Sequence, residues 1–96
     1  MKALVCHAWG GPETLVVEEV ADPVAGADEV VIRVEGCGVN FADTLIIQGK
    51  YQVKPEHPFS PGMEVAGTIA AIGSDVRDIA VGDAVIGMSG VGGFAE

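Results

Sequence analysis

Basic residues are scarce in this sequence. Lys and Arg together number five, against fourteen Asp and Glu, so the net charge is −9 at pH 7. Proteins that bind nucleic acid or anionic membrane surfaces need clustered positive charge to neutralise phosphates. We therefore expect neither of these partners. Long hydrophobic runs are missing too, because no uncharged stretch approaches the length that crosses a bilayer, and a soluble protein is expected.

Cysteine is also nearly absent. Cys6 and Cys37 are the only two, they lie far apart, and they match no Cys-x-x-Cys pattern. No hydrophobic signal-peptide segment precedes them, so a reducing, cytoplasmic location is expected. We interpret both as small, buried or half-buried thiols.

Apolar residues are plentiful and mostly fall at alternating positions. An apolar content of 49% in 96 residues is enough for one core and one domain. The runs 2–8 and 13–20 flank the sequence Trp-Gly-Gly-Pro, which predicts a β-hairpin. The runs 28–39, 63–73 and 82–88 predict further strands, in an antiparallel sheet that is covered on one face.

Glycine is abundant. The chain has 14 glycines, about twice the usual share. Many lie within or beside the predicted strands, where glycine permits bulges and sharp corners. The fold class that follows is mostly β: an antiparallel, curled and partly open β-barrel with one or two short helices.

One segment departs from the alternating pattern. Residues 41–48 have the spacing of a short helix that packs on the sheet. Asn40 is placed to cap this helix, Asp43 puts negative charge near its positive end, and Gly49 would end it. An asparagine amide both donates and accepts hydrogen bonds, so Asn40 could instead meet a ligand. Both roles for Asn40 remain open at this point.

Four sequence segments together resemble a known family. They are GCGVNFADTLIIQGKY, FSPGMEVAG, VGDAVIGM and GGFAE, in this order. The sequence resembles the N-terminal, GroES-like domain of the medium-chain dehydrogenase/reductase superfamily, within its quinone oxidoreductase branch of zeta-crystallin-like enzymes that use NADPH. The resemblance covers residues 1–96, and the joint presence of GVNFADT and PGMEVAG at this spacing makes it specific.

This resemblance bears on metal binding. In zinc-containing alcohol dehydrogenases of the superfamily, a Cys and a His stand at the positions of Asn40 and Phe41, and a second His stands at the position of Met63. An amide, a phenyl ring and a thioether are poor zinc ligands, so the resemblance implies no catalytic zinc. With two cysteines, the chain also lacks the cysteine-rich lobe that holds a structural zinc in many relatives.

The resemblance further implies a hydride-transfer site at the start of the helix. It assigns catalysis to Asn40 and Tyr51, cofactor binding to Asn40, Asp43 and Thr44, and the substrate cleft to Phe41, Tyr51 and Met63. Reducing a quinone or an activated enone leaves a delocalised anion, which needs less help from a Lewis acid than an alkoxide does. Positioning would then supply most of the catalysis. Tyr51 could equally be a loop residue that covers the sheet.

A nucleotide-binding fold is not expected in this chain. Residues 90–95 match the pattern G-x-G-x-x-A, but they lack the strand and helix that this motif requires. We interpret residues 1–96 as the catalytic domain of a longer NADPH-dependent quinone oxidoreductase, whose Rossmann domain is absent here. The 96 residues alone are expected to be inactive, and the full-length parent is expected to be a homodimer. The alternative is a free-standing GroES-like binding or assembly module without catalysis.

Overall fold

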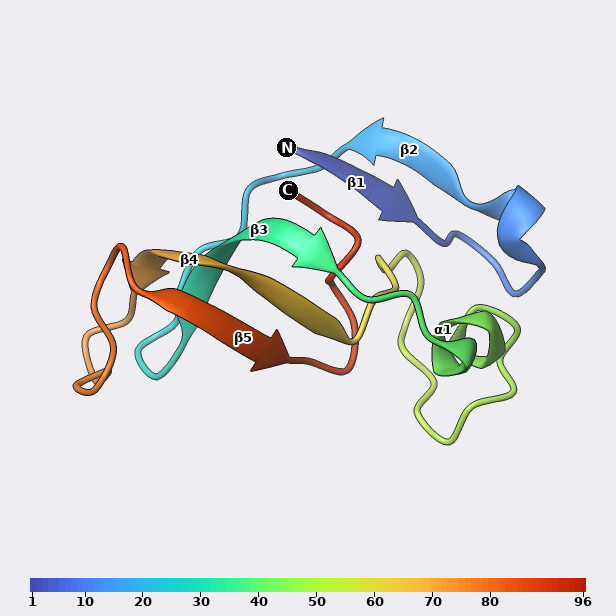
Figure 1. Cartoon of the computed structure of the whole chain (residues 1–96). Coiled ribbons are helices and arrows are strands. Elements are labelled where there is room, and N and C mark those ends of the chain that lie inside the picture. The colour runs from blue at the N-terminus through green and yellow to red at the C-terminus, as the bar shows by residue number, and fades with distance from the viewer.

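The computed structural model describes all 96 residues and contains two antiparallel sheets and one short α-helix (Figure 1). The first sheet comprises β1 (Lys2–Val5) and β2 (Val16–Glu19). The second has the order β3 (Val30–Cys37), β4 (Glu64–Ile72), β5 (Ala84–Met88). Helix α1 (Phe41–Ile46) follows β3, and a 3-10 helix, η1 (Pro12–Thr14), precedes β2. The prediction of a mostly β, antiparallel fold is confirmed.

The first sheet is the predicted hairpin, with shorter strands than the sequence suggested. Leu4 pairs with Val17 and Val5 with Val16. The second strand begins at Val16 because the residues before it form η1, which starts at Pro12. Proline is favoured at the first position of a helical turn, since its φ is already suitable and its missing N–H would have no partner there.

The second sheet is curved, and it does not close. The pairing of β3 with β4 shifts register between Val31 and Ile32 and again between Val34 and Gly36, and such bulges increase the local twist. Gly67 of β4 lies directly against the Arg33 carbonyl of β3, where any Cβ would overlap that oxygen. Because β3 and β5 remain at opposite edges, the two sheets do not form a closed barrel.

The last residues of the chain connect the two sheets. The Leu4 N–H donates to the Phe94 carbonyl at 2.8 Å, and the Glu96 N–H donates to the Lys2 carbonyl at 3.1 Å. The Val34 N–H in turn donates to the Glu96 carbonyl at 3.0 Å. Figure 1 shows the two termini side by side between the sheets. The C-terminal segment therefore joins β1 to β3 through main-chain hydrogen bonds.

Helix α1 lies at one end of the molecule, beside the loop between β1 and β2 (Figure 1). It starts where the sequence predicted and ends two residues earlier, because a turn replaces its last residues. Gly49 has a φ of 70°, a conformation that favours glycine, and the Lys50 N–H donates back to the Leu45 carbonyl at 2.9 Å. No helix in the chain has both the length and the apolar character needed to cross a membrane.

The best-packed part of the interior lies between α1, the end of β1 and the segment before β4. Cys6, Ile46, Ile47 and Phe59 form this core cluster, with exposed fractions of 0% to 8%. Cys6 and Phe59 exchange two main-chain hydrogen bonds, of 2.8 and 3.1 Å. Because Ile46 at the end of α1 and Ile47 directly after it are two of the four members, the position of α1 is fixed, and so is the position of the residues that begin it.

Candidate functional site

Asn40 occupies the N-cap of α1, as predicted, with an extended backbone (φ −119°, ψ 157°). The Asn40 N–H donates to Oδ2 of Asp43 at 2.8 Å, which is one half of a capping box. The Asn40 side chain does not complete the other half in hydrogen-bond geometry, since the Asp43 N–H donates to the Asn40 carbonyl at 3.0 Å. The Asn40 amide is exposed; its oxygen faces the Asp43 N–H without making a hydrogen bond, and its N–H groups are free.

Asp43 is the buried acid of the site. Its exposed fraction is 4%, and it is the one charged residue among the buried side chains. Its Oδ2 accepts the Asn40 hydrogen bond, whereas its Oδ1 is buried and has no hydrogen-bond partner. In the ion pairs of the chain, the basic partner is either the Met1 ammonium or His7, and neither pairs with Asp43. A buried carboxylate oxygen without a hydrogen bond is unfavourable.

Asp43 forms part of the wall of a pocket of about 410 Å³, here called the Asp43 pocket. Its other lining residues are Leu4, Pro12, Leu15, Val39, Thr44, Ile47, Pro61 and Phe94. The Thr44 hydroxyl donates to the Phe41 carbonyl at 2.6 Å, so its hydrogen is engaged within α1. Apolar groups thus dominate the pocket, and Asp43 is the one residue in its wall with a formal charge.

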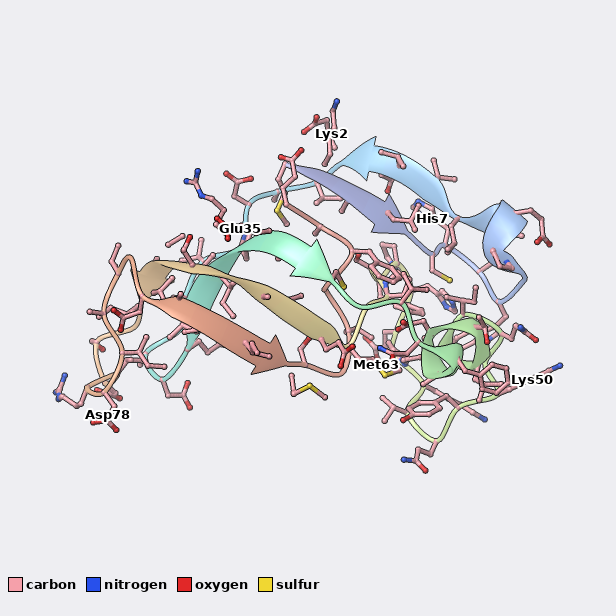
Figure 2. The ribbon with its side chains drawn as sticks, in the orientation of Figure 1. Lys2, His7, Glu35, Lys50, Met63 and Asp78 are labelled. Carbon is pink, nitrogen blue, oxygen red and sulfur yellow. The ribbon has the colours of Figure 1, made fainter.

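The predicted site residues do not all share this pocket. Asp43 and Thr44 line it, but Asn40, Phe41, Tyr51 and Met63 do not. Tyr51 and Met63 are half-buried and pack against the core cluster instead. Figure 2 shows Met63 where the second sheet meets α1. Phe41 is exposed at the first position of α1. The structure therefore places all six residues around one helix without bringing them into a single cavity.

A negatively charged neighbourhood surrounds Cys37, and the sequence analysis did not anticipate it. Burial raises the pKa of the Cys37 thiol, and the negative charges of Asp43 and Glu64 raise it further. Glu64 reaches this point because Gly38 has no side chain; a Cβ there would overlap the Glu64 carboxylate. The sequence contained one hint, the two glycines on either side of Cys37, which leave room for close neighbours.

Metal ligands do not converge anywhere in the chain. No three His, Cys, Asp or Glu side chains form a group that could hold a metal ion. Asn40, Phe41 and Met63 carry no thiolate or imidazole, so the residues around α1 do not fit a zinc ion. The two histidines are engaged elsewhere: His7 contacts Glu18 at 2.9 Å, and His57 packs edge-on against Trp9 with 4.2 Å between the ring centres.

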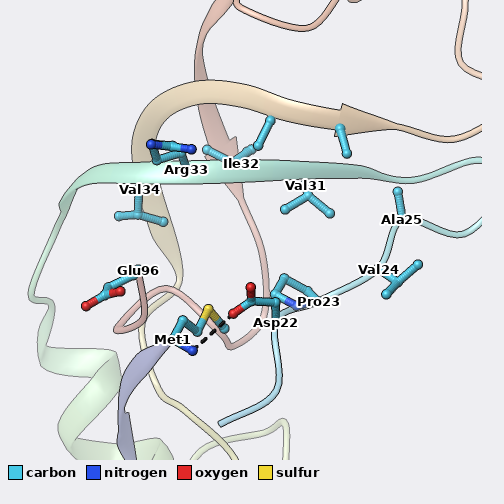
Figure 3. A pocket seen from close by; sticks show the side chains of 12 residues that line it. Met1, Asp22, Pro23, Val24, Ala25, Val31, Ile32, Arg33, Val34 and Glu96 are labelled. Atoms are coloured by element: carbon cyan, nitrogen blue, oxygen red, sulfur yellow. Dashed lines mark hydrogen bonds and ion pairs between the residues drawn. The ribbon is translucent and has the colours of Figure 1, made fainter. Parts of the chain in front are cut away.

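The largest cavity lies away from these residues. It measures about 640 Å³ and lies between the N-terminus and the face of β3 (Figure 3). The Met1 ammonium donates to Asp22 at 3.0 Å at its edge, and this hydrogen bond raises the pKa of the ammonium. Val31 and Val34 contribute apolar walls. None of the six predicted site residues lines this cavity, so its size does not make it the candidate site.

Comparisons with known proteins connect this geometry to a family. Residues 26–96 match the family of alcohol dehydrogenase GroES-like domains. The chain is 44% identical over 95 residues to "Quinone oxidoreductase-like protein 2" of Rattus norvegicus, covering 99% of this chain and 27% of that protein. It is also 44% identical over 98 residues to "Quinone oxidoreductase" of Lama guanicoe, covering 100% of this chain and 30% of that protein.

A solved structure has a similar fold. Escherichia coli quinone oxidoreductase complexed with NADPH matches with a TM-score of 0.86 and 32% sequence identity. The match covers 93% of this chain and 27% of that one. The chain thus spans less than a third of the length of each of these relatives.

Proposed function

Because this chain belongs to the family of alcohol dehydrogenase GroES-like domains, we propose that it is the substrate-side domain of a zinc-independent, NADPH-dependent quinone oxidoreductase. The observation that carries the proposal is its similarity, over nearly all 96 residues, to proteins named quinone oxidoreductase. Since it spans 27% to 30% of those proteins, the activity is proposed for a longer polypeptide that contains this domain.

The residues around α1 suit the nicotinamide of NADPH better than its phosphates. The exposed, unbonded amide of Asn40 can hydrogen-bond to the carboxamide of a nicotinamide or to the carbonyl of a substrate. A pyrophosphate is a poor fit, because Asp43 puts negative charge in the first turn of α1 and the chain as a whole carries −9. We therefore propose that this domain meets the nicotinamide and that phosphate binding occurs outside it.

The proposed reaction adds a hydride and a proton to a quinone or an activated enone. When bound, NADPH supplies the hydride, and the acceptor gains two electrons while a proton from solvent or a side chain balances the charge. The Asn40 amide would donate to the carbonyl oxygen on which negative charge develops, an interaction that strengthens in the transition state. Tyr51 is half-buried beside the core cluster, and its hydroxyl would be a second donor to the substrate.

In this site, Asp43 would hold Asn40 in position. Its Oδ2 holds the Asn40 N–H at 2.8 Å, which fixes the backbone that carries the amide. Fixing the donor before the substrate arrives lowers the cost of organising the transition state. We assign Asp43 as a positioning residue for Asn40, and Phe41 and Met63 as parts of the apolar wall beside it.

The test compares two polypeptides. NADPH oxidation in the presence of a quinone is measured for the 96-residue chain and for a natural longer protein that contains it. We expect turnover only in the longer protein, because this chain does not hold the phosphates of the donor. A longer protein that binds no NADPH and reduces no quinone would overturn the proposal and favour the alternative, a GroES-like binding or assembly module without catalysis.

A further inference from the structure

The outer edge of β5 is open to another strand. β5 pairs with β4 on one side and with no strand on the other (Figure 1). An unpaired edge offers a row of N–H and C=O groups to another chain, and proteins usually protect such an edge with charged residues, proline or a bulge. The strand Ala84–Met88 contains no charged residue and no proline, and its pairing with β4 shows no register shift.

The other edges of the two sheets are better protected. β2 carries Glu18 and Glu19, and charged residues on an edge strand oppose pairing with another chain. The side of β3 that faces away from β4 is partly covered by the C-terminal segment, because the Val34 N–H donates to the Glu96 carbonyl at 3.0 Å. β1 lies between β2 and the same segment. β5 is therefore the edge at which a further strand meets the least opposition.

The hydrogen bonds to β4 show which main-chain groups of β5 are free. In an antiparallel pair, alternate residues direct both their N–H and their C=O toward the partner strand. The Asp83 carbonyl accepts from the Ile69 N–H at 2.9 Å. The Ser89 N–H donates to the Met63 carbonyl at 2.8 Å. Odd-numbered positions thus face β4, and the N–H and C=O groups of the even-numbered residues of β5 point away from it. These residues are Ala84, Ile86 and Met88.

The same three residues have exposed side chains. Ile86 is 82% exposed, Met88 is 77% exposed, and Ala84 is exposed as well. Val85 and Gly87, whose main-chain groups face β4, are half-buried. Free main-chain groups and exposed apolar side chains therefore occur on the same residues, and an exposed hydrophobic edge of this kind is prone to pair with another chain.

The sequence of β5 fits a second copy of itself. When two β5 strands pair antiparallel about a two-fold axis at Ile86, the two Ile86 residues lie opposite each other and each Ala84 lies opposite a Met88. All the free residues of both strands then have a partner, whereas a register shifted by two residues leaves some of them unpaired. Asp83, just before the strand, falls opposite Ser89 of the other copy, so no like charges meet.

We propose that β5 is a self-association surface, through which two copies of this chain join their second sheets into one antiparallel sheet. Each pair of opposed residues exchanges both of its N–H···O hydrogen bonds across the axis. The contact is short and each copy has a net charge of −9, so the association is weak and the chain is monomeric in dilute solution. Unfolding experiments on dilute protein therefore concern the monomer, in which Ile86 is exposed. This inference does not depend on the proposed reductase activity.

Sedimentation equilibrium of the 96-residue chain, over about a hundredfold range of concentration, tests the association. We expect the mean mass to rise from that of one chain toward that of two and no further, because two-fold pairing uses the free edge of β5 in both copies. Added salt should strengthen the association, since it screens the repulsion between two acidic chains. A chain that stays monomeric at every concentration would overturn the proposal and leave the β5 edge to another polypeptide or to none.

Two lysine variants with the same change in charge test whether β5 is the contact. Ile86→Lys places two ammonium groups opposite each other at the axis and should abolish the association. Val17→Lys, at an exposed position of the other edge strand, β2, should leave the association intact. Equal losses in the two variants would place the contact elsewhere and contradict the proposal.

A mixture of charge variants tests the two-fold register and separates lost pairing from misfolding. Ile86→Glu alone should be monomeric, as Ile86→Lys is, because like charges again lie opposite each other. An equimolar mixture of the two variants should associate, since each lysine then lies opposite a glutamate. A mixture that is as monomeric as its components would show that position 86 does not face itself, and the proposal would be wrong.

Hydrogen exchange measured by NMR identifies the groups that pair. The N–H groups of Val85 and Gly87 face β4 and should be protected at every concentration. Those of Ala84, Ile86 and Met88 should exchange rapidly in dilute solution and at least about fivefold more slowly in concentrated solution. Equal exchange rates of these three N–H groups at the two concentrations would overturn the proposal.

Discussion

Apolar side chains are buried at one end of the molecule and exposed at the other. At the α1 end, Ile46 and Phe59 are almost fully enclosed in the core cluster. On β5, at the edge of the second sheet, Ile86 and Met88 are 82% and 77% exposed. Both regions were predicted from apolar patterns, but burial depends on whether another layer packs on the segment. The α1 end therefore has an enclosed core, whereas the β5 edge leaves apolar side chains exposed.

The largest expected effect tests this difference directly. Ile46→Ala should lower the free energy of unfolding by about 2–5 kcal/mol, since it leaves a cavity in the core cluster. Ile86→Ala, the same truncation on the exposed edge, should change it by less than about 0.5 kcal/mol. Urea unfolding of both variants measures the contrast. Similar losses would show that the β5 edge is buried in solution, as it would be by self-association.

The second prediction tests the close packing of β3 against β4 in the second sheet. Gly67→Ala should cost roughly 1–3 kcal/mol, because its methyl group would overlap the Arg33 carbonyl and push β3 away from β4. Gly36→Ala is the control, since a Cβ at that position meets nothing within 4 Å. Thermal unfolding compares the two variants. If Gly67→Ala is as stable as Gly36→Ala, the close approach of the two strands is not needed.

The third prediction concerns the candidate site at the α1 end. In the longer protein, Asn40→Ala should lower kcat/KM about tenfold, which corresponds to about 1.4 kcal/mol, one hydrogen bond to developing charge. Tyr51→Phe should lower it to a smaller extent. The melting temperature should barely change with Asn40→Ala, because that side chain makes no capping hydrogen bond. Unchanged kinetics with a lower melting temperature would instead show that Asn40 serves the helix and not the reaction.

The smallest expected effect lies at Cys37, where β3 ends and leads to α1. Its raised pKa keeps the thiol protonated near pH 8, so alkylation by iodoacetamide should be slow. Asp43→Asn removes one of the charges that raise this pKa and should speed alkylation by less than about tenfold. Cys6, with an exposed fraction of 0%, should react only after unfolding. Mass spectrometry locates the label, with Asp28→Asn as the control. An unchanged rate at Cys37 would mean that the Asp43 charge does not reach it.

The sequence predicted the helix and the strands better than their arrangement in space. The hairpin, the later strands and a helix beginning after Asn40 followed from local patterns, and the GroES-like class followed from motif spacing. The order of the strands in the two sheets did not, because it depends on which segments pair in space. The unpaired Oδ1 of Asp43 could not be predicted either, since it depends on which groups lie near it in space. The roles assigned to Asn40, Tyr51 and the other site residues remain predictions.

The hydrogen bonds between β1 and the C-terminal segment determine when the chain can fold during its synthesis. Lys2 and Leu4 are made first, but their partners Glu96 and Phe94 are made 94 and 90 residues later. Contacts between residues so far apart in sequence form slowly, because the ends of a long loop must first meet. The hairpin can therefore form on the ribosome, whereas the two sheets are joined only after Glu96 has emerged from it.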